Sequence, residues 1–230
     1  MTTSLIIPVY NEADYIPLLV QSIRNSSIKP DEILFCDNNS TDDSIRVIQQ
    51  TCKELPYIIL KEPKKGIIPT VERLWRAAKG DIILKVDADS ILPHHWIRNV
   101  LKHFIDNPTL AACTGTILAA DGPFIKRLLL NIGYRVNASL YRMIKGYYLL
   151  FGPNAAIRKT ALTRVEGYVW PEFVLDDQII SYKLHAARLP TAFFNDIFIY
   201  HSTRRFSSNP MTYVEPILAF VNPRYYSVKS

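Results

Sequence analysis

Cysteine is scarce in this chain of 230 residues: only Cys36, Cys52 and Cys113 occur. They are odd in number and widely spaced, which argues against a disulfide framework, and none has the spacing of a zinc-binding pair. We therefore expect a reducing, cytoplasmic location.

Long hydrophobic runs are missing as well. No window of about 18 residues is apolar throughout, so the sequence predicts no membrane-spanning helix. The apolar residues 5–9 are too few for a signal peptide and are typical of a first β-strand.

Glycine-rich loops of the kind that hold nucleotide phosphates do not occur. The pattern G-x-G-x-x-G is absent, which argues against a dinucleotide-dependent oxidoreductase. Residues 1–20 contain no glycine, whereas a sugar nucleotidyltransferase, which also uses a parallel sheet and a carboxylate-bound metal, would need a glycine-rich loop there. We keep that enzyme class as an alternative function.

Acidic residues are absent from residues 122–165, which contain eight lysines and arginines. The net charge of the whole chain is +6, so the rest of the chain is slightly acidic. An anionic partner is therefore expected to meet residues 122–165.

The composition of this segment points to lipid rather than nucleic acid, because leucine and tyrosine recur at helix-like spacing. The predicted face consists of Leu128, Leu129, Ile132, Tyr141, Ile144 and Tyr148, with Lys126, Arg127, Arg142 and Lys145 beside it. We expect peripheral contact with an anionic membrane and no nucleic-acid partner. The alternatives are that this face belongs to the core, or that the protein is a non-catalytic module that binds membrane or glycan.

The first half of the chain alternates strand and helix patterns. Strand patterns at residues 3–9, 32–36 and 57–60, and a fourth leading into Asp87, are separated by amphipathic helix patterns. This alternation predicts an α/β fold with a mainly parallel, Rossmann-like sheet flanked by helices. It stops after Gly115, so we expect one domain with a C-terminal elaboration on the same sheet.

The fourth strand pattern ends in two carboxylates one residue apart, Asp87 and Asp89. Open α/β sheets bind ligands at the carboxyl edge, and extended geometry would put both side chains on the same side. Two such anions repel each other unless a cation lies between them. The sequence therefore predicts a Mg²⁺ or Mn²⁺ site here, with a solvated aspartate-rich turn as the alternative.

The first two strand patterns also end in side chains suited to a nucleotide. Tyr10, in the run Pro8-Val9-Tyr10-Asn11-Glu12, can stack on a base, and Glu12 can accept hydrogen bonds from a ribose. Asp37 can accept the imide N–H of a pyrimidine, just before Ser40 or Thr41 caps a helix. A packed tyrosine and a simple helix cap are the alternatives.

Two further polar groups lie toward the C-terminus. The pair Asp176-Asp177 begins a helix pattern, where the helix dipole alone would favour acidic residues. His201 ends a strand pattern and is followed by Arg204 and Arg205, and arginine can bind phosphate with two parallel hydrogen bonds. A strand-end histidine satisfied by the backbone is the alternative for His201.

In this order and spacing, the motifs resemble those of the family 2 glycosyltransferases, which have a GT-A fold and use nucleotide-sugar donors. The resemblance covers nearly the whole chain. Its motifs lie at residues 4–12, 37–42, 66, 77–81, 87–89, 152–159, 165–168 and 176–177. One departure occurs at Asp176, where the family usually has glutamate, so the division of roles between Asp176 and Asp177 stays open.

The resemblance implies a role for each matching position. Residues 1–116 would form the nucleotide-sugar-binding half of a single GT-A domain, and residues 117–230 the acceptor-binding half. The implied nucleotide-sugar ligands are Pro8, Tyr10, Glu12, Asp37 and Asp87; the metal ligands are Asp89 and His201; and the phosphate or acceptor ligands are Arg158, Arg204 and Arg205.

The implied reaction is a single displacement with inversion at the anomeric carbon. Asp177, with Asp176 beside it, would take the proton from the acceptor hydroxyl, while the metal neutralises charge on the leaving diphosphate. Asp37 favours a UDP-sugar over a GDP-sugar. The acceptor is a glycan or a lipid-linked hydroxyl or phosphate, and we expect a role in cell-envelope glycan synthesis.

Processive synthases of the family carry spanning helices and a Gln-x-x-Arg-Trp motif. Neither pattern occurs in this chain. Their absence favours transfer of a single sugar.

Overall fold

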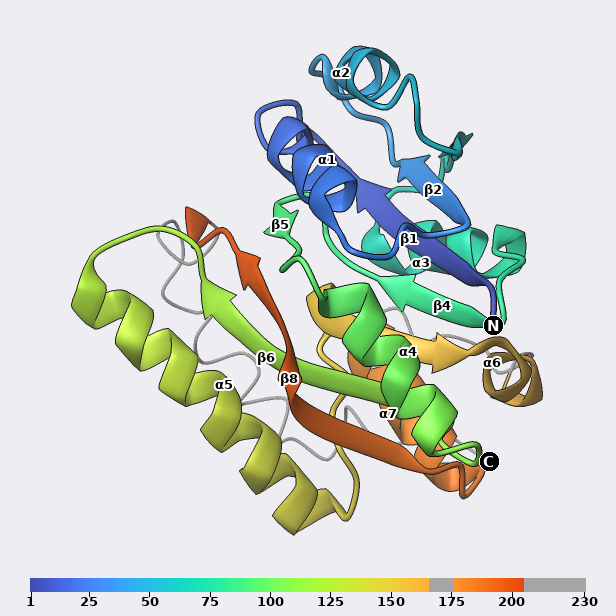
Figure 1. Ribbon diagram of the computed structural model, residues 1–230, viewed down its shortest axis with the longest axis vertical. Helices are drawn as coiled ribbons and strands as arrows, with labels where there is room; N and C mark the ends of the chain where they lie inside the picture. Colours follow the sequence, from blue (N-terminus) through green and yellow to red (C-terminus); the bar gives the residue numbers. More distant parts are fainter. Residues whose placement is uncertain (166–175, 205–230) are drawn as a thin grey trace.

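The computed structural model of this protein describes residues 1–165 and 176–204. Arg205 and residues 166–168 of the predicted motif lie outside that part of the chain, as do the side chains of Lys126, Leu129 and Asp176. The described strands form one sheet in the order β3-β2-β1-β4-β7-β6-β8-β5, with helices packed on it (Figure 1).

The first half of the chain has the predicted alternation of strands and helices. Strands β1 (Thr3–Val9), β2 (Glu32–Asp37), β3 (Tyr57–Lys61) and β4 (Ile82–Lys85) pair in parallel, and helices α1 (Ile16–Asn25), α2 (Ser44–Thr51) and α3 (Ile67–Ala77) connect them. Every residue of β1 is buried, as is usual for a parallel strand covered by helices on both faces.

The second half adds antiparallel strands to a sheet that stays mainly parallel, as predicted. It comprises β5 (Ser90–Ile91), α4 (Trp96–Asp106), β6 (Ala112–Ala119), α5 (Phe124–Lys145), β7 (Ala155–Arg158), α6 (Lys159–Val165), α7 (Asp176–Ala186) and β8 (Thr191–His201). Strand β7 is antiparallel to both β4 and β6, and β5 is antiparallel to β8. The pattern of apolar residues reveals a strand but not its direction, so the sequence could not show this reversal.

Strand β8 is one long element that ends at His201, as the strand pattern there predicted. It runs parallel to β6, and the pairing register shifts between Gly115 and Ile117. A Cβ atom built on Gly115 would lie 1.6 Å from the backbone oxygen of Ile197, so only glycine allows the two strands to approach there.

Two hydrophobic cores lie on opposite faces of the sheet. Alternation along β1 sends Leu5, Ile7 and Val9 to one core and Ile6 to the other. Helices α1, α2, α4 and α5 cover the first core, and α3, α6 and α7 cover the second. Full burial of one such aliphatic side chain stabilises the fold by about 1.5–3 kcal/mol, so the two cores hold the strand ends rigidly.

The face that the sequence predicted for α5 and the following loop is only partly on the surface. Leu128, Ile132 and Ile144 are exposed, whereas Tyr141 is 2% exposed and Tyr148 is half-buried. Tyr141 instead packs edge-on against Tyr147 in the core. The predicted face is therefore corrected: Tyr141 belongs to the core, and Tyr148 is only partly exposed.

Among residues 1–165 and 176–204, no helix combines the length and the apolar character needed to cross a bilayer.

Candidate active site

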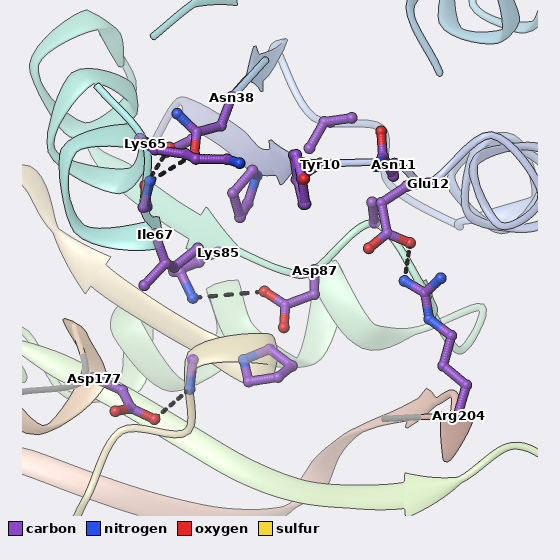
Figure 2. A pocket seen from close by; sticks show the side chains of 17 residues that line it. Tyr10, Asn11, Glu12, Asn38, Lys65, Ile67, Lys85, Asp87, Asp177 and Arg204 are labelled. Atoms are coloured by element: carbon purple, nitrogen blue, oxygen red, sulfur yellow. Dashed lines mark hydrogen bonds and ion pairs between the residues drawn. The ribbon is translucent and has the colours of Figure 1, made fainter. Parts of the chain in front are cut away.

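The carboxyl ends of β1, β2 and β4 meet at one edge of the sheet, beside a cavity of about 760 Å³ (Figure 2). The parallel register aligns Val9 with Asp37, so the loops that follow these strands emerge together. Residues from the second half of the chain complete the wall. Of the predicted site residues, Pro8, Tyr10, Glu12, Asp87, Asp177 and Arg204 line this cavity.

An aromatic ring and a cation stand together on one side of the cavity. Tyr10 is 44% exposed, and Lys65 Nζ lies 5.6 Å from the centre of its ring. The side chain of Asn38 holds the loop of Lys65 in place, since its Oδ1 accepts the Gly66 N–H at 2.7 Å and its Nδ2 donates to the Lys64 carbonyl at 2.8 Å. The ring offers a stacking surface for a base, and the ammonium adds a positive charge beside it.

Asn38 and Lys65 are site residues that sequence reasoning missed. Asn38 stands directly after Asp37 in a polar loop at a strand end, which is a signal that could have found it. Lys65 follows a proline and a second lysine in a loop with no motif of its own, so no local pattern singled it out.

Asp37 lies at the end of β2 but is not among the residues that line the cavity. It is 8% exposed, and its Oδ1 accepts the backbone N–H of Ser40 at 3.1 Å. This contact stabilises the turn after β2. Contact of Asp37 with a base stays a prediction.

Glu12 and Arg204 form an ion pair at the mouth of the cavity (Figure 2). Glu12 is 2% exposed, and its backbone N–H donates to Ser44 Oγ at 2.8 Å, which fixes the loop after β1. The guanidinium carbon of Arg204 lies 4.2 Å from the centre of the Tyr15 ring, and its Nε lies 3.5 Å from Asp89 Oδ2. The C-terminal end of the described chain therefore borders the cavity beside Glu12.

Asp87, Asp89 and His201 form a cluster whose potential ligand atoms all lie within 4.8 Å of one another. His201 Nε2 is 3.0 Å from Asp89 Oδ1 and 3.5 Å from Asp87 Oδ2. Asp89 is 4% exposed, and its carboxylate contacts two cationic side chains, with His201 Nε2 at 3.0 Å and Arg204 Nε at 3.5 Å. Two carboxylates beside a buried imidazole fit a divalent cation such as Mn²⁺ or Mg²⁺.

The charge of His201 depends on these carboxylates. Burial lowers the pKa of its imidazole, but the contacts with Asp87 and Asp89 outweigh burial and raise the pKa to about 10. Without a metal, the protonated imidazole therefore balances part of the negative charge of the pair. A cation that takes this place must displace the proton from Nε2.

Asp177 reaches the cavity from the first turn of α7. Its Oδ2 accepts the backbone N–H of Gly152 at 3.3 Å and its Oδ1 accepts the N–H of Gln178 at 2.8 Å. These donors stabilise the ionised carboxylate at the helix N-terminus. Figure 2 shows Asp177 on the opposite side of the cavity from Tyr10.

Lys85 is a further residue that the sequence did not suggest. It ends β4, is 5% exposed, and holds its Nζ 3.7 Å from Asp87 Oδ1. A Cβ atom on Gly152 would lie 2.8 Å from this Nζ and 3.7 Å from Asp177 Oδ2, so the glycine leaves room for both groups. The ammonium therefore lies between the metal cluster and Asp177.

Arg158 lies away from the cavity, which corrects its assignment to phosphate or acceptor binding. Strand β7 is antiparallel to β4, so Arg158 pairs with Ile82 at the far end of β4 from Asp87. Its guanidinium donates to the carbonyls of Leu110 at 3.1 Å and Phe104 at 3.3 Å. These bonds give it a structural role.

The family comparison identifies what this arrangement is similar to. Residues 4–167, well over half of the chain, match the model of glycosyl transferase family 2. A chondroitin synthase of Pasteurella multocida (strain Pm70) is 33% identical over 125 residues, which is 53% of this chain and 13% of the synthase. The chain thus spans a small part of the length of that relative.

Solved structures share the fold over most of the chain. The mannosyltransferase PcManGT from Pyrobaculum calidifontis, in complex with GDP-Man and Mn²⁺, has a TM-score of 0.67 at 21% identity and covers 88% of this chain and 57% of its own. TarS 1-349 of S. aureus, in complex with UDP-GlcNAc, has a TM-score of 0.67 at 20% identity and covers 94% of this chain and 64% of its own. At these identities the likeness establishes the fold.

Proposed function

The chain belongs to the family 2 glycosyltransferases, and on that premise we propose that it transfers a single sugar from a nucleoside diphosphate to a glycan or lipid-linked acceptor. The transfer is a metal-dependent displacement with inversion. The observation that carries the proposal is that one cavity is lined by Asp87 of the acidic metal cluster, by an aromatic and basic wall at Tyr10, and by the carboxylate of Asp177.

The nucleotide binds on the Tyr10 side of the cavity. The Tyr10 ring stacks on the base, Pro8 closes the same wall, and Lys65 is close enough to meet a phosphate oxygen. Glu12 and Asp87 accept hydrogen bonds from the ribose side. We favour UDP over GDP because Asp37 supplies an acceptor for a pyrimidine imide; similar folds have been solved with UDP-GlcNAc and with GDP-Man.

Asp89 and His201, with Asp87 beside them, would hold the divalent metal. Mn²⁺ or Mg²⁺ bound there would supply positive charge against the diphosphate leaving group. Arg204, whose Nε is already 3.5 Å from Asp89, orients the phosphates from the same side.

Asp177 takes the proton from the acceptor hydroxyl. Its carboxylate accepts hydrogen bonds from two backbone N–H groups, and it faces the cavity opposite the nucleotide wall. A base on that side directs the acceptor to the face of the anomeric carbon away from the diphosphate, which inverts the configuration. Asp176 precedes it and is the alternative base.

The acceptor enters from the side of the C-terminal half. Gly152 and Pro153 line the cavity there, and they follow the strongly basic helix α5. We place the enzyme in the cytoplasm at the inner face of the membrane, where lipid-linked intermediates of envelope glycans are exposed. The three free, buried cysteines suit a reducing compartment.

The test is turnover with a panel of UDP- and GDP-sugars, Mn²⁺, and either saccharides or polyprenyl phosphates as acceptors. We expect nucleoside diphosphate release that requires one donor and one acceptor together, and NMR of the product should show the inverted anomer. Asp177→Asn serves as the inactive control that still binds donor. Failure of every nucleotide-sugar to bind in the presence of Mn²⁺ would overturn the proposal.

A further inference from the structure

Helix α5 has an apolar side that points away from the sheet. Its 22 residues lie beside β6 at the outer edge of the molecule (Figure 1). Six large apolar side chains at spacings of three or four residues form a stripe along it and are between 44% and 72% exposed. This α5 apolar face consists of Ile125, Leu128, Ile132, Val136, Leu140 and Met143.

Within residues 1–165 and 176–204, the hydrophobic cores do not include this face. The core-facing side of α5 is supplied by Tyr134, Ala138 and Tyr141, and Asn131 Oδ1 accepts the backbone N–H of Ala119 at 2.9 Å, which ties the helix to β6. A helix at a protein surface normally turns polar side chains outward. A continuous exposed apolar stripe instead marks a surface that meets a partner.

The charge around the stripe identifies the partner as anionic. By helical spacing Arg135 and Arg142 lie along one edge of the stripe, in a segment that has no acidic residue from 122 to 165. Arg127 is on the core-facing side, where its Nε donates to the Ala119 carbonyl at 3.2 Å. A second copy of the chain, related by twofold symmetry, would place the basic edges of the two stripes against each other. An anionic bilayer can interact with both the apolar stripe and the basic residues. Apolar side chains enter the boundary of the acyl chains, while arginine and lysine reach the anionic head groups.

The stripe begins beside the active site. Asp121, just before α5, accepts hydrogen bonds from the Thr203 N–H at 2.8 Å and from Ser202 Oγ at 2.9 Å. These residues precede Arg204 at the mouth of the cavity. Phe124, the first residue of α5, is 77% exposed. A surface that binds the start of α5 is therefore close to the entrance of the cavity.

We propose that the α5 apolar face docks on the surface of an anionic lipid bilayer. The helix lies in the plane of the interface, with its apolar side chains inserted and its basic residues against lipid phosphates. This docking specifies the membrane placement in the proposed function and brings the cavity to a lipid-carried acceptor. The docking itself requires no catalysis, so it is tested separately.

The experiment is co-sedimentation of the full chain with vesicles of phosphatidylcholine alone or mixed with phosphatidylglycerol. A face variant carries Ile132→Gln, Val136→Gln and Met143→Gln. A matched control carries Leu18→Gln, Ile58→Gln and Ile105→Gln, which replace three equally exposed apolar residues on α1, β3 and α4. Circular dichroism and urea unfolding establish that each variant is folded.

The wild type and the control should pellet with anionic vesicles at low salt, and less with neutral ones. The partition coefficient of the face variant onto anionic vesicles should be lower than that of the wild type by about tenfold or more, because three inserted side chains become polar. Arg135→Gln should weaken binding at low salt with a smaller effect at high salt.

Three results would overturn the proposal. The wild type could remain in the supernatant at low salt, the control could lose as much binding as the face variant, or sedimentation velocity could show a dimer that only the face variant dissociates. None of these depends on sugar transfer. If vesicles bind as expected and no nucleotide-sugar is turned over, the docking stands and the proposed function fails.

Discussion

Arg204 contacts the carboxylate of Glu12 across the mouth of the cavity, although 192 positions separate the two residues. The same guanidinium lies against the Tyr15 ring and within 3.5 Å of Asp89. One side chain thus joins the loop after β1 to the metal cluster. A diphosphate bound between the loop after β1 and the metal cluster would therefore contact the Arg204 guanidinium.

Arg204→Met should weaken donor binding by about 10- to 100-fold in the presence of Mn²⁺, because a charge-assisted hydrogen bond to phosphate is lost. Calorimetric titration with the preferred nucleoside diphosphate measures the change. Arg76→Met, on the exposed side of α3, is the matched control and should bind normally. Equal affinities for wild type and Arg204→Met would remove Arg204 from the phosphate site.

Asp177→Asn should reduce turnover by about 100-fold or more while donor affinity changes little, because the amide retains the shape and loses the basicity. Asp176→Asn is the comparison variant. If Asp176→Asn is inactive and Asp177→Asn is nearly normal, the two aspartates exchange roles.

Asp37→Ala should weaken nucleotide binding by about 1–3 kcal/mol, because it leaves a donor group of the base without its acceptor. Affinity is measured for uridine and guanosine diphosphates side by side, and the loss should be larger for uridine. Unchanged affinity for both would reduce Asp37 to the turn contact with Ser40 that the structure shows.

The carboxyl-edge loops could be predicted from the sequence because parallel strands end at the same edge of a sheet. Tyr10, Glu12 and Asp87 follow apolar runs, so the change from apolar to polar residues is enough to mark the ligand side. Lys85 could not be found in this way. It lies inside the strand pattern, and only the folded structure, where Lys85 lines the cavity beside Gly152, shows that its ammonium faces the site.

Arg158 and the α5 segment show where sequence patterns fail for physical reasons. The direction of β7 decides which end of β4 meets Arg158, and direction leaves no trace in the apolar pattern. In α5, apolar residues occur on more than one side, so periodicity cannot tell the buried Tyr141 from the exposed Met143. Tertiary packing alone makes that choice.

Removal of metal should give His201 a distinct effect on stability. In the unfolded chain the pKa of its imidazole is near the ordinary value of 6.5, and in the folded protein this pKa is raised to about 10. Its stabilising contribution is therefore complete below pH 6.5 and is lost as pH rises toward 10. In chelator, wild type should lose stability relative to His201→Gln over that range, measured by urea unfolding. If the two curves of unfolding free energy against pH stay parallel, the contacts of His201 with Asp87 and Asp89 do not stabilise the folded protein.

Calorimetric titration of nucleoside diphosphate into wild type and Asp89→Asn, each with Mn²⁺ and with EDTA, tests the central claim most directly. Asp89 is buried and its carboxylate lies 3.0 Å from His201 Nε2, so a cation bound there should hold donor and protein together. We predict tight binding only for wild type with Mn²⁺, and a loss of about 100-fold or more in the other three titrations. Equal affinity of wild type in Mn²⁺ and in EDTA would contradict a metal-dependent transferase.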